Sequence, residues 1–240
     1  SFMLLHKAAR KILPKWILKE LKLTNLRQYS VESYSQEGED MILRRIFEHK
    51  RKGFYVDVGA HHPKRFSNTY YFYKQGWRGI NIDATPGSMQ AFNKVRPADL
   101  NIEAAISRER KFLTFYMFDE PALNGFSKQL SEQRNANTQA CRITKTIDIE
   151  TVTLSQILDK HLPKGQLIDF MSIDVEGLDY DVLQSNDWSR FRPEIILVEI
   201  PDSSLEDLLD HEITKLLHLQ GYVITSKSMY TVFFALEASR

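Results

Sequence analysis

The 240-residue chain has a single cysteine, Cys141, and no long hydrophobic run. One cysteine excludes a disulfide within the chain and a structural zinc site built from several cysteines, and it fits a reducing compartment. A transmembrane helix needs roughly 20 consecutive apolar residues, and no run approaches that length. Hydrophobic residues make up 42% and charged residues 26% of the chain, which is typical of an ordinary globular protein. We therefore expect a cytoplasmic protein built on one large domain.

The chain also lacks a net charge of either sign, but its total of +1 conceals an uneven distribution. Residues 1–30 contain seven Lys and Arg and one Glu, which gives +6 and leaves −5 for the other 210 residues. Apolar residues alternate with these cations on both sides of Pro14, so the segment is basic and amphipathic. It either packs on the domain or on a second subunit, or lies on an anionic membrane surface. No long uncharged core or small-residue cleavage site follows it, so a signal peptide is not expected.

Strand-like and helix-like patterns alternate from residue 35 onward. Strand-like segments lie at residues 53–59, 77–84, 100–106, 111–118, 144–154, 167–177, 193–200, 222–228 and 229–236. Helix-like segments lie at residues 38–53, 67–76, 85–97, 155–165, 178–188 and 203–221. Repeated βα units predict an α/β fold with a parallel sheet covered by helices on both faces. The last two strands are too close in sequence for a helical crossover, which predicts an antiparallel hairpin.

Particular residues predict where helices begin and end. Thr85 is the expected N-cap of one helix, with Pro86 at its first helical position. Ser203 and Glu206 match a capping box, and Gly221 is the expected end of that helix. Residues 119–142 are polar and weakly periodic, so we expect a mobile loop or lid there.

Two acids follow the first two predicted strands of the parallel sheet. Asp57 and Gly59 end the first strand, and Asp83 ends the second, 24 residues after Gly59. In open α/β sheets, ligands bind at the carboxyl ends of the strands. A carboxylate at the end of the second strand can accept hydrogen bonds from both hydroxyls of a ribose. The pattern therefore predicts a ligand that contains a nucleoside.

The loop between these strands, "DVGAHHPKRFSN", has only one glycine. Dinucleotide-binding loops use three glycines, G-x-G-x-x-G, so that the backbone can approach a pyrophosphate. Here His61, His62 and Pro63 make the loop bulky, and Asp57 would repel a phosphate. A ligand with a ribose, a positive charge and no phosphate is S-adenosylmethionine. The loop correspondingly disfavours a nucleotide-binding oxidoreductase.

The sequence resembles the FkbM-type S-adenosylmethionine-dependent methyltransferases. Five motifs carry the resemblance in the family's order: "SQEGEDMIL" at 35–43, "YVDVGAHHPKRFSNT" at 55–69, "GWRGINIDATP" at 76–86, "IDVEGLDYDVL" at 173–183 and "EIILVEI" at 194–200. The resemblance covers about residues 30–236. It implies a class I methyltransferase (Rossmann-like) fold, with a seven-stranded, mostly parallel sheet and a C-terminal antiparallel hairpin. Residues 31–240 would form this domain, and residues 1–30 a helical appendage.

The resemblance also implies positions around the cofactor. It places Gln36 and Asn68 near the amino-acid end, Asp57 and Gly59 beneath the methionine part, Asp83 with Ala84 at the ribose, and Ala105 within the 103–106 segment beside the adenine.

Methylation of a hydroxyl requires loss of its proton, so a base is expected near the acceptor. Asp174 and Glu176 end one strand and Glu199 ends the next, which brings three carboxylates to one edge of the sheet. One of them could be a base whose pKa its neighbours raise, or Asp174 and Glu199 could hold a divalent cation. The alternative for Asp174 or Glu176 is to cap the following helix. His61 and His62 are further catalytic candidates, with backbone hydrogen bonding in the loop as their alternative.

The family often acts in surface polysaccharide synthesis, so we expect O-methylation of a sugar, glycan or related natural product. Glycans and nucleotide sugars are the expected acceptors. No nucleic-acid partner is expected, because the chain beyond residue 30 is net acidic. Residues 1–30 are the expected site of peripheral membrane contact or dimerisation. The alternative function is a catalytically silent S-adenosylmethionine-binding module or adaptor.

Overall fold

A computed structural model describes residues 29–136, 141–201 and 203–237. The chain divides into two units, residues 1–33 and residues 34–240, and the second contains all the elements below. The helical appendage expected at residues 1–30 lies almost entirely outside the described residues. Within the described part of the chain, no helix combines the length and the apolar character of a membrane span.

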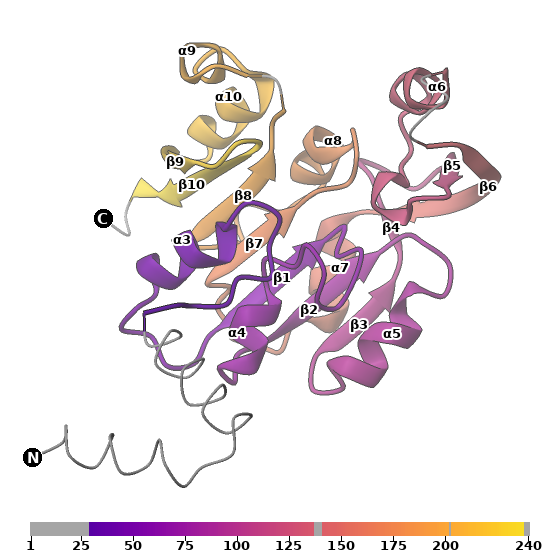
Figure 1. Cartoon of the computed structure of the whole chain (residues 1–240). Coiled ribbons are helices and arrows are strands. Elements are labelled where there is room, and N and C mark those ends of the chain that lie inside the picture. The colour runs from indigo at the N-terminus through magenta and orange to yellow at the C-terminus, as the bar shows by residue number, and fades with distance from the viewer. Residues whose placement is uncertain (1–28, 137–140, 202, 238–240) are drawn as a thin grey trace, which may run out of the picture. The chain divides into compact units, whose positions relative to one another are not determined.

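The large unit is built on a seven-stranded sheet (Figure 1). Its strand order is β3 (Leu100–Glu103), β2 (Arg78–Asp83), β1 (Phe54–Val58), β7 (Phe170–Ile173), β8 (Ile195–Glu199), β10 (Thr231–Leu236) and β9 (Tyr222–Lys227). The first five strands are parallel, and β10 is antiparallel to both of its neighbours. This order confirms the predicted class I fold with a C-terminal antiparallel hairpin.

Helices cover both faces of this sheet (Figure 1). One core lies between the sheet and α7 (Leu154–His161), α8 (Asp179–Gln184) and α10 (Glu212–Leu219). The other lies against α3 (Glu39–Ile46) and α4 (Tyr70–Lys74), and α5 (Ser88–Val95) packs beside them. All five residues of β1 are buried, because both of its faces meet a helical layer. Such double burial explains why the central strands are nearly continuous apolar runs.

Aromatic side chains fill the core beneath α3 and α4. Trp77 is 2% exposed, and its ring lies 4.8 Å from that of Phe72 and 5.4 Å from that of Phe47, centroid to centroid. Phe170 of β7 closes the cluster, 5.0 Å from Phe72. Edge and tilted contacts at these distances add to the free energy of burial.

A second, three-stranded sheet has the order β4 (Ala105–Ile106), β6 (Ile143–Val152) and β5 (Phe112–Phe118). The sequence predicted one strand over residues 100–106, but the chain changes sheets within it. Ala104 N donates to Asp83 O at the point where β2 ends, so no partner in the large sheet remains beyond it. The next residues pair with β6 instead.

Residues 119–136, named the arm here, connect β5 to the second half of the small sheet (Figure 1). The predicted loop at 119–142 contains a 3₁₀ turn, η1 (Pro121–Leu123), and a helix, α6 (Lys128–Ala136). Ser131 is the only buried residue of α6, and this explains why the sequence shows so little apolar periodicity. Whether the arm moves as a lid stays a prediction.

Two predicted helix starts are wrong by a few residues. The helix expected to begin at Thr85 is α5, which begins at Ser88 after Gly87, a residue with φ of 80°. Thr85 and Pro86 form the preceding turn, in which Ser88 N donates to Thr85 O. The carboxylate of Asp83 already accepts a hydrogen bond from Thr85 N, and this holds the chain in a turn rather than a helix.

The segment 203–221 is two helices rather than one. The first is α9 (Leu205–Leu208), and its capping box is formed by Ser204 and Asp207, one residue later than the predicted pair. A second helix begins after it, because the His211 side chain accepts from Ile213 N and caps the start of α10. Gly221, with φ of 80°, follows the last turn as predicted.

Candidate functional site

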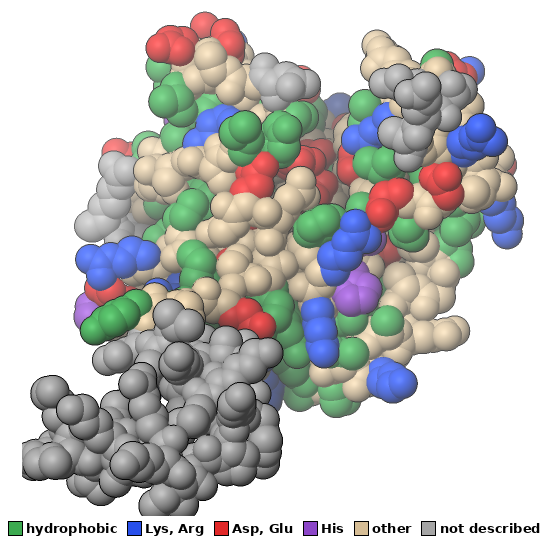
Figure 2. Space-filling view, viewed as in Figure 1, with side chains coloured by type: hydrophobic (Ala, Val, Ile, Leu, Met, Phe, Trp, Pro, Cys, Tyr) green, Lys and Arg blue, Asp and Glu red, His purple; other side chains and the backbone are tan. Residues whose placement is uncertain are grey.

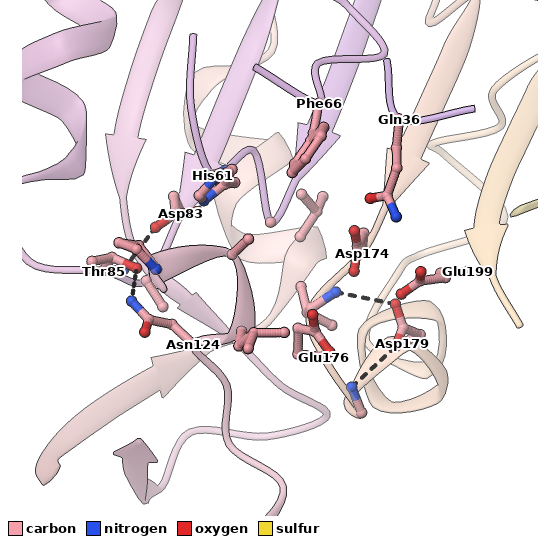
Figure 3. A pocket seen from close by; sticks show the side chains of 18 of the residues that line it. Gln36, His61, Phe66, Asp83, Thr85, Asn124, Asp174, Glu176, Asp179 and Glu199 are labelled. Carbon is pink, nitrogen blue, oxygen red and sulfur yellow. Dashed lines mark hydrogen bonds between the residues drawn. The ribbon is translucent and has the colours of Figure 1, made fainter. Parts of the chain in front are cut away.

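A cavity of about 580 Å³ opens at the carboxyl ends of β1, β2, β7 and β8 (Figure 3). That volume lies within the usual range for small-ligand sites. The predicted site residues that line it are Gln36, Gly59, His61, Asn68, Asp83, Ala84, Asp174, Glu176 and Glu199. Those outside the lining are Asp57, His62 and Ala105. Most of the predicted residues are therefore brought together at one edge of the sheet.

Gly59 lies where two main-chain segments meet. Its φ is 82°, and a Cβ atom there would come within 1.7 Å of the carbonyl oxygen of Asp174. The contact arises because Asp174 N donates to Val58 O (3.0 Å), which extends the β1–β7 pairing by one residue. Only glycine fits this backbone conformation and this close approach together.

Asp83 is held with its carboxylate at the cavity wall (Figure 3). One oxygen accepts from His61 N and the other from Thr85 N, both at 2.8 Å. A carboxylate oxygen has two lone pairs, so each oxygen can still accept a hydroxyl. The geometry fits the predicted role at a ribose.

Asp57 faces away from the cavity. Successive strand residues point to opposite faces, so Asp57 lies on the same face as Tyr55, toward α4. Its Oδ2 accepts from the Thr69 hydroxyl (2.7 Å). Burial raises the pKa of Asp57 to about 6, against the opposing effects of Thr69 and Arg96. The structure therefore gives it a place beneath the 61–69 loop rather than in the cavity wall.

The buried Arg96 supports the same loop from the other side. Its guanidinium donates to Asp99 (2.9 Å), to the Tyr55 hydroxyl (2.9 Å) and to Ser67 Oγ (3.4 Å). Ser67 and Thr69 are thus both anchored in the interior, and the residue between them, Asn68, lines the cavity. Its amide donates to Ser172 Oγ (3.0 Å). Sequence reasoning missed Arg96, because a helix-terminal arginine before a proline usually lies in solvent.

The two loop histidines have different surroundings. His61 lines the cavity, and its Nε2 is buried without a hydrogen-bond partner among the described residues. Burial lowers the pKa of His61, so the ring is neutral at pH 7. His62 is exposed, and its Nδ1 accepts from Lys64 N (3.1 Å) and Arg65 N (2.9 Å). His62 therefore bonds to the loop backbone, which was the alternative to a catalytic role for these histidines. His61 keeps a free nitrogen for a ligand.

The carboxyl groups of Asp174 and Glu199 are neighbours at the other end of the cavity. Asp174 lines the cavity and is exposed there. Partial desolvation and the charges of Glu199 and Glu176 raise the pKa of Asp174 above its usual range. Partial burial and the charge of Glu176 raise the pKa of Glu199, and its interaction with Asp174 acts in the opposite direction. The two neighbouring carboxyl groups therefore hold a proton more readily than isolated carboxyl groups would.

Asp179 is a cavity residue that sequence reasoning missed (Figure 3). Its carboxylate accepts from Val175 N (3.2 Å) and Gly177 N (3.4 Å) in the turn before α8. The backbone-binding role considered for Asp174 or Glu176 therefore belongs to Asp179. Burial raises the pKa of Asp179 to about 7. The sequence did offer one indication of this role, because Asp179 follows the turn residue Gly177 by two positions.

Glu176 has φ of 53° and accepts a hydrogen bond from Arg134 of α6 (2.7 Å). A second ion pair, Arg65 with Glu120, joins the loop after β1 to the start of the arm at 2.9 and 3.2 Å. The arm thereby contacts both ends of the cavity. Its apolar contribution to the wall consists of Pro121, Ala122, Leu123, Phe126 and Leu130.

The predicted metal ligands do not form a metal centre. Among the described residues, no group of three or more His, Cys, Asp or Glu side chains is arranged to hold an ion. The geometry therefore gives the predicted divalent cation no support.

The strand order and a cavity at the carboxyl edge are those of a class I methyltransferase. The family model described as the methyltransferase FkbM domain matches residues 57–224. The chain belongs to the FkbM methyltransferase family, and it is an S-adenosylmethionine-dependent methyltransferase.

Two solved structures are similar to the chain. A TehB-like S-adenosylmethionine-dependent methyltransferase from Corynebacterium glutamicum is 11% identical with a TM-score of 0.43, covering 91% of this chain and 96% of that one. A putative RNA methyltransferase from Pyrococcus horikoshii is 10% identical with a TM-score of 0.42, covering 91% and 98%. No curated protein gives a significant match.

The cavity residues fit the cofactor that the family implies. Asp83 has lone pairs free for the ribose, and the buried Nε2 of His61 lacks a partner among the described residues. The acidic end suits a cation, since a sulfonium and an ammonium both carry positive charge. When bound, S-adenosylmethionine supplies an electrophilic methyl group, and the protein's task is to position the acceptor and exclude water.

Proposed function

We propose that the protein methylates a hydroxyl group of a sugar, glycan or related natural product. The observation that carries the proposal is the pair of neighbouring carboxyl groups, Asp174 and Glu199, which lines the cavity. It lies across the cavity from His61 and Asp83 (Figure 3). The Asp83 end would hold adenosine, and the carboxyl pair would lie beside the acceptor.

Transfer of a methyl group to a hydroxyl releases the hydroxyl proton, which must pass to a base. Glu199 has a raised pKa that its interaction with Asp174 partly offsets, so we assign the role of base to Glu199. Asp174 is the neighbouring carboxyl group that adjusts the proton affinity of Glu199. Glu176 is neutralised by Arg134, so we assign it to holding the arm rather than to proton transfer.

The charges of the cavity indicate which acceptors it suits. Eight carboxyl groups and two arginines line it, and each arginine forms an ion pair with one of those carboxylates, Arg65 with Glu120 and Arg134 with Glu176. Figure 2 shows acidic side chains gathered around the hollow between the two halves of the large unit. No cation of the described lining remains to bind a phosphate. This supports uncharged polyhydroxyl acceptors over the nucleotide sugars that the sequence suggested.

The test is to incubate the full chain with S-adenosylmethionine and a panel of neutral glycans, amino sugars and nucleotide sugars. Mass spectrometry of the products should show a gain of one methylene on a hydroxyl of a neutral acceptor. Methylation confined to an amine or a carboxylate would contradict the proposal. If calorimetry shows cofactor binding but no acceptor in a broad panel is methylated, the silent binding module is favoured instead.

A further inference from the structure

A basic groove lies at the opposite edge of the large sheet from the cavity. It has a volume of about 570 Å³ and is lined by Arg44, Arg45, Phe47, Glu48, Lys50, Arg51, Tyr71, Phe72, Gln75 and Trp77. The segment 44–52 contains the last turn of α3 and most of the connection to β1, and it lies at the amino end of β1, because Gly53 O, just ahead of that strand, accepts from Arg78 N. Lys50 also pairs with Asp169, which directly precedes β7. The groove and the cavity therefore lie at opposite ends of the same strands.

The charge of this groove differs sharply from that of the rest of the unit. Residues 44–52 contain five Lys and Arg and one Glu, a sum of +4, whereas residues 34–240 as a whole sum to −4. Arg45 pairs with Glu48 and Lys50 with Asp169. Among the described residues, no carboxylate pairs with Arg44 or Arg51, and both side chains are exposed. The positive charges of Arg44 and Arg51 are therefore left without an ion-pair partner among the described residues.

Apolar residues lie in and next to the groove. Phe47 and Trp77 are buried lining residues, and Ile46, outside the lining but adjacent to Arg45 and Phe47 in the sequence, is 39% exposed. A surface that presents guanidinium groups beside an apolar side chain fits the interface of a bilayer, where phosphates lie above acyl chains. Guanidinium groups bind phosphate oxygens in a bidentate manner, and a small apolar side chain reaches the boundary below them.

We propose that the groove at residues 44–51 is a docking surface for an anionic phospholipid membrane. Its arginines contact lipid phosphates, and Ile46 enters the interface. Each Lys or Arg near an anionic surface strengthens binding, so two unpaired arginines are significant. The basic sequence at residues 1–30 would bind to the same kind of surface, and two weak signals together give stable attachment.

Cosedimentation of the full chain with vesicles tests the proposal. The probes are phosphatidylcholine vesicles with and without phosphatidylserine. The variant carries Arg44→Glu with Arg51→Glu, and the matched control carries Arg108→Glu with Lys145→Glu. Both changes alter the charge equally, and the control cations are exposed residues at the small sheet, outside the cavity and the groove. Thermal melting should show that both variants fold.

The unaltered chain and the control should bind only the vesicles that contain phosphatidylserine. The groove variant should bind them on the order of 10-fold or more weakly. If the groove variant binds as well as the control, residues 1–30 account for all of the binding and the proposal is wrong. It is also wrong if the unaltered chain binds neither kind of vesicle, which would indicate a partner other than a membrane.

Discussion

The carbonyl oxygen of Asp174 occupies the space that a side chain at position 59 would need. A Cβ atom on Gly59 would lie 1.7 Å from that oxygen. The loop that carries His61 and the strand end that carries Asp174 are therefore in direct backbone contact, and the two ends of the cavity are held in register. The single glycine of the loop follows from this contact, whatever the ligand is.

Substituting Gly59 tests this contact. Gly59→Ala forces a left-handed conformation on alanine and also a clash with main-chain atoms. Gly76→Ala is the matched control, because Gly76 has φ of 91° and a Cβ atom there would meet no heavy atom within 4 Å. The control should lose about 1 kcal/mol of unfolding free energy, and Gly59→Ala several more. Urea unfolding measures both. Equal losses would show that the backbone at Gly59 moves freely.

Asp83 should determine affinity for the adenosine part of the cofactor. Asp83→Ala removes a charged acceptor of hydroxyls and leaves His61 N and Thr85 N unpaired. A hydrogen bond to a charged group contributes about 1.5–3 kcal/mol, so the Kd for S-adenosylhomocysteine should rise roughly 10-fold to 100-fold. Calorimetry measures it, with Glu109→Ala, an exposed change outside the cavity, as the control. Unchanged affinity would remove Asp83 from the ribose site.

The pH dependence of methylation should report on Glu199. The pKa of Glu199 is raised, so the rate should increase with pH through a midpoint above the ordinary glutamate value of about 4.3. Glu199→Gln should abolish this increase together with most of kcat. Glu194→Gln, outside the cavity, should leave both unchanged. A normal pH profile in Glu199→Gln would assign the base elsewhere, with His61 as the next candidate.

Asp179 should make the fold less stable as pH rises. Its pKa of about 7 in the folded state exceeds the value of about 3.9 expected when unfolded. Between these values the folded state binds more protons, so this group's stabilising contribution, complete below pH 4, is lost as pH rises through 7. Urea unfolding at pH 5 and pH 8 should show the decrease. Asp179→Asn should reduce it, whereas Asp119→Asn, a change in the exposed start of the arm, should not.

The sequence predicted the main sheet well because central strands are uniformly apolar and turn residues separate them. The mostly parallel sheet, the closing hairpin and the acids at strand ends all followed from local pattern together with the family resemblance. The site residues that line the cavity lie at strand ends, where topology alone fixes their position.

Other features depended on tertiary contacts that no local pattern reveals. Asp57 was expected in the cofactor site, yet its face of β1 meets the Thr69 hydroxyl and the buried Arg96. The capping box was displaced by one residue because Ser203 and Ser204 are adjacent and both are capable of capping. The predicted strand at 100–106 was divided because β2 ends at Asp83, and periodicity within a strand does not show where its neighbour stops.

The transfer of the chain from one sheet to the other, at Ala104, has an evolutionary consequence. The main chain from β4 to β6 is connected to the rest of the large unit at two neighbouring points, where it enters at Ala104 and where it leaves at Thr153 into α7. A change in the length of this module would leave the strand registers that hold Gly59 and Asp83 in place. Diversification of acceptor preference in such enzymes should then be concentrated in one exchangeable cassette, while the cofactor end changes slowly.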